Sequence, residues 1–380
     1  MKVLLIGNLP MDGQTSMLLF QAVMERELRR LGCDVRLVTA QPLVLRLPYP
    51  KRLRKWVGYV DKFVLFPFAL RAHLRWADVA HVTDHSNAMY VPHIASKPNV
   101  VTCHDVIAIQ AALGMIDGWK VGRTGRLFQR LISRGLGRTD LVACVSHLTR
   151  RHLLALGLAE ESKVRVVLNG LNADFAPVPP EQAAPLIARF GLGPQERYVM
   201  HIGWDLARKN RITVLRAFID LQSRATASGK PPLANRLLFV GPELSTEMAA
   251  IARESGVLEQ VTVIRDVSHE DLCALYSSSV ALLFPSLQEG FGWPIIEAQA
   301  CGCPVFTSDL PPMNEIGGDG AVYVDPNNAV ALAEAVTRHA PDLPLIRTRA
   351  LANASHYSSE RMALGYIETY RQAIEARRSK

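Results

Sequence analysis

The feature that most constrains the fold of this chain is a repeated alternation of short apolar runs with segments of helical periodicity. Short apolar runs without helical periodicity are typical of strands buried on both faces of a parallel sheet. Six lie in the first half, at 3–6, 35–38, 79–82, 100–103, 141–145 and 164–167. Six more lie at 198–202, 237–240, 261–264, 281–284, 304–306 and 321–324. Since helix candidates such as 18–31, 212–222 and 269–277 separate them, we predict an α/β protein with two doubly wound sheets.

A proline-rich segment, 174–193, lies between the two sets of strands and contains four prolines. Such composition is typical of an interdomain connection. We therefore predict an N-terminal domain over 1–175 and a C-terminal domain over 194–356. The remaining segment, 357–380, is a further helix candidate.

A strand, a glycine-rich bend and a helix start follow one another after Val280. The bend is Gly290-Phe291-Gly292, and Trp293-Pro294 opens the helix. Proline suits the first helical turn because the N–H that it lacks has no partner there. The free N–H groups and the dipole of such a helix start favour an anion, most often a phosphate.

Two carboxylates flank this bend, Glu289 before the glycines and Glu297 one turn into the helix. Helical side chains lean toward the N-terminus, so Glu297 is expected to point at the bend. A carboxylate there can accept hydrogen bonds from the vicinal hydroxyls of a ribose or a sugar. The alternative is that Glu297 only complements the helix dipole and that Glu289 is a solvated loop residue. The combination with the glycines and the turn 300–305 favours a binding site.

The stretch 285–305, PSLQEGFGWPIIEAQACGCPV, resembles the signature of the family-4 retaining glycosyltransferases. The resemblance implies the GT-B fold, in which two Rossmann-like domains face each other across a cleft. It implies that the first domain binds the acceptor and the second the nucleotide-sugar donor, and that the helix 357–380 crosses back onto the first domain. It also implies that Glu289 lies by the donor sugar, that Glu297 holds the nucleotide ribose, and that Gly290, Phe291, Gly292 and Trp293 line the donor site.

Adjacent cations, Arg208 and Lys209, follow the first strand of the second half. A lysine at this edge of the sheet can neutralise the charge that builds up on a departing diphosphate. Lys209 matches the phosphate-binding lysine of the family. The family usually has an arginine directly after the glycine, where this chain has Trp204, and Arg208 is the candidate to supply that charge. The alternative is a solvated basic pair before a helix.

Two residues of the first half match further parts of the family pattern. The stretch 101–105, VTCHD, resembles the histidine motif of the acceptor-side domain, which implies that His104 contacts the donor sugar. A structural role at the end of a buried strand is the alternative. Gly13 matches one glycine of a loop that usually has two adjacent glycines and contacts the diphosphate. The stretches that contain Ser146 and Asn169-Gly170 also resemble the family. A helix N-cap at Ser146 and a turn at Asn169-Gly170 are sufficient to explain them, so we assign both to the scaffold.

No pattern for a metal site occurs in the sequence. There is no Asp-x-Asp pair, no CxxC pair among the six cysteines, and no histidine cluster with zinc spacing. We expect no metal and no cofactor, and a reduced, cytoplasmic chain. No signal-peptide pattern opens the sequence, and the longest apolar run, 63–70, is too short to span a bilayer.

The basic residues are concentrated in the first half: residues 1–175 hold 24 Lys and Arg against 13 Asp and Glu, and the remainder holds 19 against 22. They cluster in 46–55, with Lys51, Arg52 and Arg54, and in 120–138. In the second segment Arg123, Arg126, Arg130, Arg134 and Arg138 recur at helical spacing, and Leu127, Leu131 and Ile132 are expected on a different part of that helix. Nearby aromatic residues are Trp56, Tyr59, Phe63, Trp119 and Phe128. This pattern favours a domain that rests on an anionic membrane at the inner face of the plasma membrane, although a solvated helix face would also explain it.

No nucleic-acid-binding module is recognisable, so we expect no nucleic-acid partner.

Together these features favour a retaining, metal-independent glycosyltransferase that moves a hexose from a GDP- or UDP-linked donor to an acceptor hydroxyl. The expected acceptor is a lipid-linked or saccharide molecule, in the synthesis of a cell-surface polysaccharide or glycolipid. Mannose-type and glucose-type donors are expected from the resemblance alone. Two alternatives stay open: a GT-B sugar-nucleotide epimerase, and a catalytically inactive binding subunit, which Trp204 and the single Gly13 would suit.

Overall fold

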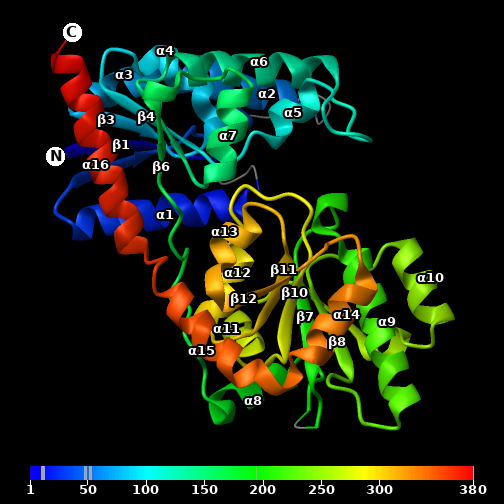
Figure 1. Cartoon of the computed structure of the whole chain (residues 1–380). Coiled ribbons are helices and arrows are strands. Elements are labelled where there is room, and N and C mark those ends of the chain that lie inside the picture. The colour runs from blue at the N-terminus through cyan, green and yellow to red at the C-terminus, as the bar shows by residue number, and fades with distance from the viewer. Residues whose placement is uncertain (10–12, 47–48, 51–53, 194, 380) are drawn as a thin grey trace. The chain divides into compact units, whose positions relative to one another are not determined.

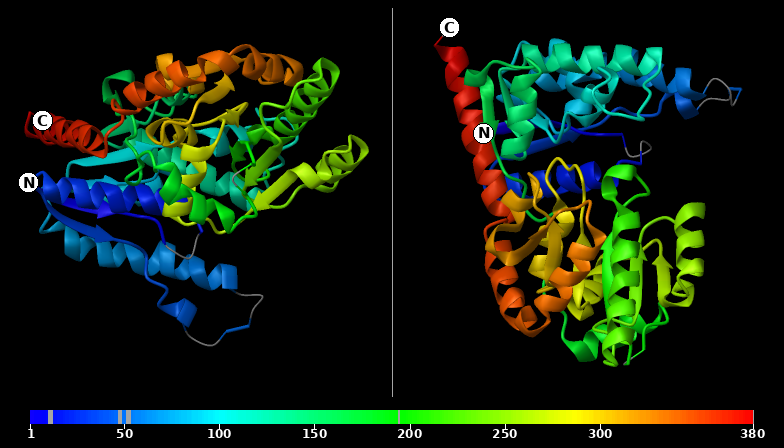
Figure 2. Two further views of the ribbon diagram at one scale, coloured as in Figure 1. Left: turned by 90° about the horizontal axis from the view of Figure 1, so that it is seen from below. Right: turned by 45° about the vertical axis from the view of Figure 1, so that its right-hand side comes forward.

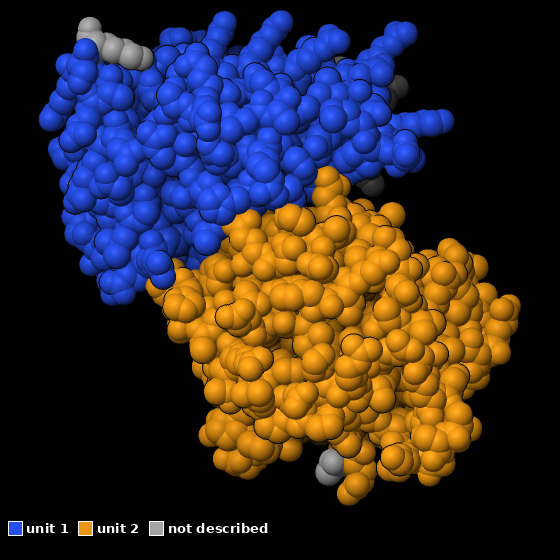
Figure 3. Space-filling view, viewed as in Figure 1, with its two compact units in different colours: residues 1–172, 359–380 blue, residues 173–358 orange. Residues whose placement is uncertain are grey.

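The structure is a computed structural model of the 380-residue chain. It describes residues 1–9, 13–46, 49–50, 54–193 and 195–379, without the side chains of residues 45 and 54–56. The chain divides into two compact units (Figure 3). Unit 1 comprises Met1–Asn172 with Ser359–Lys380, and unit 2 comprises Ala173–Ser358.

Unit 1 contains a parallel sheet of six strands among the described residues, in the order β2-β1-β3-β4-β5-β6. The strands are β1 (Lys2–Ile6), β2 (Asp34–Val38), β3 (Val79–Val82), β4 (Asn99–Cys103), β5 (Leu141–Cys144) and β6 (Val164–Val166). The helical elements are α1 (Thr15–Arg30), η2 (Val44–Arg46), α2 (Arg54–Val60), the π-helical turn η4 (Asp61–Leu65), α3 (Phe66–Leu74), η5 (His85–Tyr90), α4 (Val91–Ile94), α5 (Ile107–Ala112), α6 (Arg123–Arg138), α7 (His147–Ala155), η6 (Glu161–Lys163) and α16 (Ser359–Arg378).

The inner strands of this sheet are apolar because helices cover both faces. In β1, Val3 to Ile6 are fully buried, and each such side chain contributes roughly 1.5–3 kcal/mol to stability. Among the described residues, β2 is an outer strand of the sheet, and its Arg36 is exposed. The alternation of apolar runs in the sequence thus reflects burial on both faces of the sheet.

The C-terminal helix α16 belongs to unit 1, where it packs along α1 and onto β3, β4 and β5 (Figures 1 and 2). Buried hydrogen bonds fix its position. The Tyr366 hydroxyl bonds to Thr102 Oγ1 at 2.8 Å, and the Tyr370 hydroxyl bonds to His81 Nδ1 at 2.7 Å. Burial lowers the pKa of His81 to about 3, so this imidazole is neutral at physiological pH.

Unit 2 contains a second parallel sheet of six strands among the described residues, in the order β12-β11-β10-β7-β8-β9. The strands are β7 (Tyr198–Ile202), β8 (Arg236–Val240), β9 (Val261–Ile264), β10 (Ala281–Phe284), β11 (Val305–Ser308) and β12 (Ala321–Val324). The helical elements are α8 (Pro180–Ala188), η7 (Ala207–Lys209), α9 (Arg211–Ser228), α10 (Thr246–Glu254), η8 (Leu258–Gln260), α11 (His269–Ser278), α12 (Trp293–Ala300), α13 (Met313–Gly317), η9 (Gly318–Gly320), α14 (Ala329–Arg338), η10 (Ala340–Asp342) and α15 (Leu343–Ala354).

The prediction of two doubly wound α/β sheets is confirmed. The segment 174–193, interpreted from its prolines as a connection, is not a bare linker. It contains α8, which begins at Pro180 and packs against α11 inside unit 2. Proline at the first helical position allows this start. No helix in the described part of the chain is long and apolar enough to cross a membrane.

Candidate functional site

The candidate site of unit 2 lies where the strand order reverses direction. From β7 the chain moves outward through β8 and β9, then returns to form β10 on the other side of β7. The loops that follow β7 and β10 therefore diverge above neighbouring parallel strands and leave room for a ligand at the carboxyl edge. The first loop carries Arg208 and Lys209, and the second carries Glu289, which lies 80 residues after Lys209 in the sequence.

The structure brings these three residues into direct contact. Glu289 is 8% exposed, and its Oε1 accepts hydrogen bonds from Lys209 Nζ at 2.7 Å and from Ser286 Oγ at 2.6 Å. Its Oε2 accepts a hydrogen bond from Arg208 Nη1 at 3.0 Å. The interpretation of Glu289 as a solvated loop residue is therefore wrong, and so is that of a solvated basic pair, since Lys209 is also largely buried.

The two cations determine the charge of Glu289. Burial alone would raise the pKa of this carboxyl, but Lys209, Arg208 and the hydrogen bond from Ser286 outweigh burial and hold the pKa below its usual range. Glu289 is therefore ionised at neutral pH. The cluster carries two positive charges and one negative charge, which leaves a net positive charge for an anionic ligand.

The loop after β7 is held in a fixed conformation. Ala207–Lys209 forms the turn η7, and Asn210 adopts a left-handed conformation with φ 54° before α9. The Asn210 amide donates hydrogen bonds to the carbonyls of Pro285 and Pro326, which anchors the loop to the segments after β10 and β12. Trp204 is 68% exposed. Because it is a tryptophan, the position at which the family usually has an arginine carries no charge here.

The bend after β10 leads into α12 as predicted from the glycines. Gly292 has φ 101°, a conformation that glycine adopts readily, and α12 begins at Trp293. Glu297, on α12, is 6% exposed, and its Oε2 accepts a hydrogen bond from the Tyr276 hydroxyl at 3.4 Å. Tyr276 comes from α11 and gave no signal in the sequence, because a tyrosine in an apolar helix face is typical of core.

The predicted donor-lining residues of the bend differ in exposure. Phe291 is 3% exposed and packs against the rings of Trp293 and Tyr357, both at 6.0 Å between centroids. Its ring is therefore part of the core, and it contributes to the bend by packing. Gly290 and Trp293 are partly exposed.

A buried histidine that the sequence analysis did not select lies under the same loops. His201, on β7, donates a hydrogen bond from Nδ1 to the Leu283 carbonyl at 2.9 Å, and burial lowers its pKa to about 4. The ring is therefore neutral with a bare Nε2, which has no hydrogen-bond partner among the described residues. A Cβ at Gly203 would lie 3.5 Å from this nitrogen, in ordinary van der Waals contact with it.

Unit 1 has its own reversal of strand order, between β1 and β3, and polar side chains gather there. Asn8 donates to Asp84 Oδ2 at 2.6 Å, and Asn87 donates to Asn8 Oδ1 at 2.9 Å. Burial alone would raise the pKa of Asp84, but His85, His104 and hydrogen bonds from Asn8 and Ser86 hold it below its usual range. This carboxylate is thus buried, ionised and fully hydrogen-bonded.

His104 lies beside this cluster, after β4. It is 6% exposed, its Nε2 donates to the Thr83 carbonyl at 3.0 Å, and the Phe20 ring packs edge-on at 4.7 Å between centroids. Burial lowers the pKa of His104, with partial opposition from Asp84. Gly13 is exposed, with φ 68°, and directly follows residues outside the described part of the chain. His104 and Gly13 belong to unit 1, whereas all the other predicted site residues belong to unit 2.

The arginine-rich segment forms helix α6, and Arg123, Arg126, Arg130, Arg134 and Arg138 are all exposed. The expectation for Leu127 is wrong: it is 54% exposed and lies among the arginines, one turn from Arg123 and Arg130. Ile132 and Leu136 form the buried face instead. Within the other basic segment, 46–55, Lys51 and Arg52 lie outside the described residues, as do the side chains of Arg54 and Trp56.

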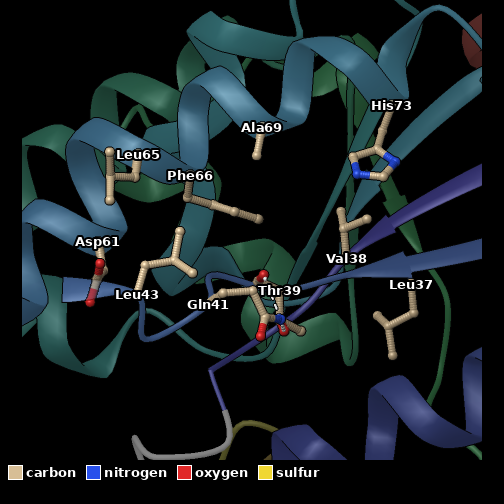
Figure 4. A pocket seen from close by; sticks show the side chains of 10 residues that line it. All are labelled: Leu37, Val38, Thr39, Gln41, Leu43, Asp61, Leu65, Phe66, Ala69 and His73. Atoms are coloured by element: carbon tan, nitrogen blue, oxygen red, sulfur yellow. Dashed lines mark hydrogen bonds between the residues drawn. The ribbon is translucent and has the colours of Figure 1, made fainter. Parts of the chain in front are cut away.

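Two pockets of unit 1 lie away from the predicted site residues. One, of about 230 Å³, lies between the end of β2 and the segment η4–α3, with Asp61, Phe66 and His73 in its lining (Figure 4). The other, of about 350 Å³, is lined by Arg134 and Arg138 of α6 together with apolar side chains of η4, α3 and α4 such as Phe63 and Pro67. No group of three or more metal-ligating side chains lies within the described ranges.

Comparison with known proteins agrees with this architecture. The family model described as "Glycosyl transferases group 1" matches residues 186–344, and the model "Glycosyltransferase Family 4" matches residues 23–175. Similar curated proteins include O-antigen chain mannosyltransferase B of Escherichia coli, 24% identical over 76% of this chain and 73% of that protein. O-antigen chain mannosyltransferase RfbU of Salmonella typhimurium is 26% identical over 81% of this chain and 76% of that protein.

Among solved structures, Anabaena Alr3699/HepE in complex with UDP and glucose superposes with a TM-score of 0.74 at 17% identity. The match covers 98% of this chain and 100% of that one. This likeness shows the fold, which is GT-B. Because the two family models together match most of the chain, the protein belongs to the GT-B glycosyltransferases of group 1 and family 4.

Proposed function

We propose that this glycosyltransferase is a retaining enzyme that moves a hexose from a GDP- or UDP-linked donor to an acceptor hydroxyl, without a metal ion. The observation that carries the proposal is the contact between Lys209, Arg208 and Glu289 at the switch point of unit 2. Its net positive charge, next to the start of α12, suits a diphosphate. Unit 2 is therefore the proposed donor-binding unit and unit 1 the proposed acceptor-binding unit.

Each residue of the cluster has a distinct proposed role. Lys209 and Arg208 stabilise the negative charge that builds up on the diphosphate as the bond to the sugar breaks, which lowers the barrier because that charge is largest in the transition state. Glu289 holds both cations at the sheet edge and lies by the donor sugar. Glu297 accepts hydrogen bonds from the ribose hydroxyls. His104 of unit 1 is the proposed contact to the sugar.

The proposed retention of configuration rests on the resemblance to the family-4 retaining glycosyltransferases, and the proposed independence of a metal rests on the two cations of the cluster. As in that family, the reaction is proposed to proceed on one face of the sugar, with the departing phosphate taking the proton of the acceptor. Two positive side chains replace the charge that a divalent ion would supply. The related O-antigen mannosyltransferases and the complex of HepE with UDP and glucose support a hexose donor and a cell-surface polysaccharide or glycolipid product.

The test is a binding screen by thermal shift with GDP, UDP, GDP-mannose and UDP-glucose. A ligand at 100 times its Kd adds about 2.7 kcal/mol to the free energy of unfolding. One nucleotide diphosphate is expected to stabilise the protein, and Lys209→Ala is expected to reduce the shift. A matched control is Lys230→Ala, an exposed lysine beyond α9. If no nucleotide shifts the wild-type protein, the proposed donor class is wrong.

We also propose that α6 rests on an anionic membrane surface at the inner face of the plasma membrane. None of its five arginines at helical spacing pairs with a carboxylate of the described residues, and Leu127 and Trp119 are exposed beside them. Each basic residue near such a surface contributes about 1 kcal/mol. This surface lies on the unit that is the proposed acceptor side, so a lipid-linked acceptor would suit it.

Co-sedimentation with vesicles tests the membrane proposal. Wild-type protein is expected to bind anionic vesicles at low salt and to dissociate at high salt. Arg126→Gln with Arg130→Gln should weaken binding, whereas Arg253→Gln with Arg349→Gln, two exposed arginines of unit 2, should leave it unchanged. Equal loss in both pairs, or no binding at low salt, would contradict the proposal and favour a soluble saccharide acceptor.

A further inference from the structure

The pocket of about 350 Å³ in unit 1 is lined by residues of η4, α3, η5, α4 and α6, and none of them is a residue proposed above for donor binding. Helices α3, α4 and α6 lie together in Figure 1, and α4 contacts both of the others. Helix α6 approaches η5 closely because residue 135 is a glycine: a Cβ at Gly135 would collide with the carbonyl oxygen of Ala88. The ring of Phe63, in η4, stacks on Phe128 of α6 at 5.2 Å between centroids. These contacts hold the walls of the pocket together.

One side of α6 supplies the charge of the pocket. Leu131, Arg134 and Arg138 are three and four residues apart, so they lie along one stripe of the helix, and both arginines are exposed. None of the described lining residues is a carboxylate. His93 is also in the lining, and burial and Arg71 lower its pKa, so its imidazole is neutral at pH 7. The two guanidinium groups therefore give the pocket a net positive charge.

The rest of the lining is mainly apolar and includes Phe63, Pro67 and Met89. A guanidinium group binds phosphate oxygens through paired N–H donors, which gives Arg134 and Arg138 a natural ligand. The apolar side chains have no use for a small hydrated anion such as free phosphate. The lining as a whole is therefore complementary to a phosphate that carries an apolar chain.

The surface around the pocket is also partly apolar. Val64 and Phe68 each directly follow a lining residue, and they are 48% and 63% exposed. Leu127, one turn before Leu131 on α6, is 54% exposed. Exposed apolar side chains among basic ones are typical of a surface that contacts lipid, and they would be unfavourable beside a soluble ligand. The anion with an apolar chain is thus best explained as a lipid.

We propose that this pocket binds one anionic lipid, with its phosphate between Arg134 and Arg138 and the first carbons of its chains against Phe63, Pro67 and Leu131. A pocket of this size accommodates part of such a molecule. The choice of a lipid as the source of the phosphate rests on the proposed contact of α6 with a membrane. A single bound lipid would hold unit 1 at a defined point of the membrane surface, which the general attraction of a basic helix does not provide.

The test measures binding of a soluble lipid by calorimetry on the full-length protein. The probe is dihexanoyl phosphatidic acid below its critical micelle concentration, so no membrane surface is present. We expect saturable binding at one site. Glycerol 3-phosphate, which has the phosphate without the chains, should bind at least about tenfold more weakly, since each buried methylene group contributes about fourfold. Dihexanoyl phosphatidylcholine, with the same chains and a zwitterionic headgroup, should also bind more weakly.

Two pairs of arginines on the same helix provide the matched variants. Arg134→Gln with Arg138→Gln should weaken binding of the soluble phosphatidic acid by at least about tenfold, because each loses charged hydrogen bonds to the phosphate. Arg126→Gln with Arg130→Gln removes two exposed arginines outside the lining and should leave this affinity unchanged. For the apolar wall, Leu131→Trp should fill the pocket and weaken binding, whereas Leu127→Trp, on the exposed surface, should not.

Three results would overturn the pocket. They are no saturable binding of phosphatidic acid, an equal loss of affinity in the two arginine pairs, and equal affinity for phosphatidic acid and either control ligand. Equal affinity for glycerol 3-phosphate would identify a site for free phosphate, and equal affinity for phosphatidylcholine a site for the chains alone. The proposed membrane contact of α6 fails separately, since it requires the wild-type protein to bind anionic vesicles at low salt. Glycosyl transfer is tested by neither experiment.

Discussion

Replacement of Glu289 by glutamine tests the arrangement of charges at the centre of the candidate site. The wild-type carboxylate accepts hydrogen bonds from Lys209, Arg208 and Ser286 and is 8% exposed. Loss of one partner of a buried ion pair costs about 3–5 kcal/mol, because the remaining charge stays buried. Glutamine keeps one oxygen acceptor, and Arg208 retains 28% side-chain exposure, so we expect a loss of about 2–3 kcal/mol in the free energy of unfolding.

The effect depends on pH with a defined sign. Since the pKa of Glu289 is lowered in the folded protein, its charge contributes stability above the pKa of an unfolded glutamate, about 4.3. This contribution disappears as the pH falls through the lowered pKa, where the wild-type carboxyl also becomes neutral. The difference between wild type and Glu289→Gln should therefore be constant from pH 6 to 8 and shrink below about pH 4.3.

Urea unfolding, with hydrogen exchange on peptides of unit 2 to locate the effect, measures this difference. The matched control is Glu243→Gln, which removes an exposed ion pair with Arg265 and should cost at most about 1 kcal/mol. Glu289→Gln should bind a nucleotide diphosphate at least as tightly as wild type, because Lys209 and Arg208 lose the anion that they contact. Its turnover should nevertheless fall. Equal stability of the two proteins at pH 7, or a difference that grows in acid, would refute this account of Glu289.

Three further predictions concern the donor chemistry. Glu297→Gln should weaken donor binding by at least about tenfold, because two hydrogen bonds to a charged acceptor are worth about 1.5–3 kcal/mol each. The control Glu254→Gln, at the exposed end of α10, should keep the wild-type affinity, and equal affinities of wild type and Glu297→Gln in calorimetry would contradict the ribose contact. Lys209→Ala should lower kcat more than it changes KM in steady-state kinetics, because its charge acts mainly in the transition state, and an effect on KM alone would assign it to binding only. Activity should persist in excess chelator, and a loss that magnesium or manganese restores would show that the reaction needs a metal.

The sheets were predictable from the sequence because strands buried on both faces leave an unambiguous apolar pattern. The predicted strands 79–82, 198–202, 261–264, 281–284 and 321–324 have the bounds seen in the structure. Helix ends were less accurate: α9 extends to Ser228, six residues beyond the predicted end, because its later turns contain polar residues that do not continue an apolar face. The helix α8 was hidden by its own prolines, which the composition alone assigns to a linker.

The pattern of residues along the chain was sufficient to select the residues of the candidate site. It was not sufficient to predict which of them are in contact. No local pattern shows that Lys209 and Arg208 meet Glu289, because the contact depends on β7 and β10 being neighbours. The same holds for Tyr276 beside Glu297. His201 was missed because a histidine inside an apolar strand looks like any buried residue until its neighbours are known.

The central claim is glycosyl transfer from a nucleotide diphosphate sugar at the cluster of Lys209, Arg208 and Glu289. The most direct test is proton NMR of a reaction with the donor selected by the binding screen, in excess chelator and with an acceptor. The account predicts stoichiometric release of the nucleoside diphosphate and a glycoside with the anomeric configuration of the donor, with Lys209→Ala far slower than Lys230→Ala. A product of inverted configuration, or Lys209→Ala at the wild-type rate, would contradict it.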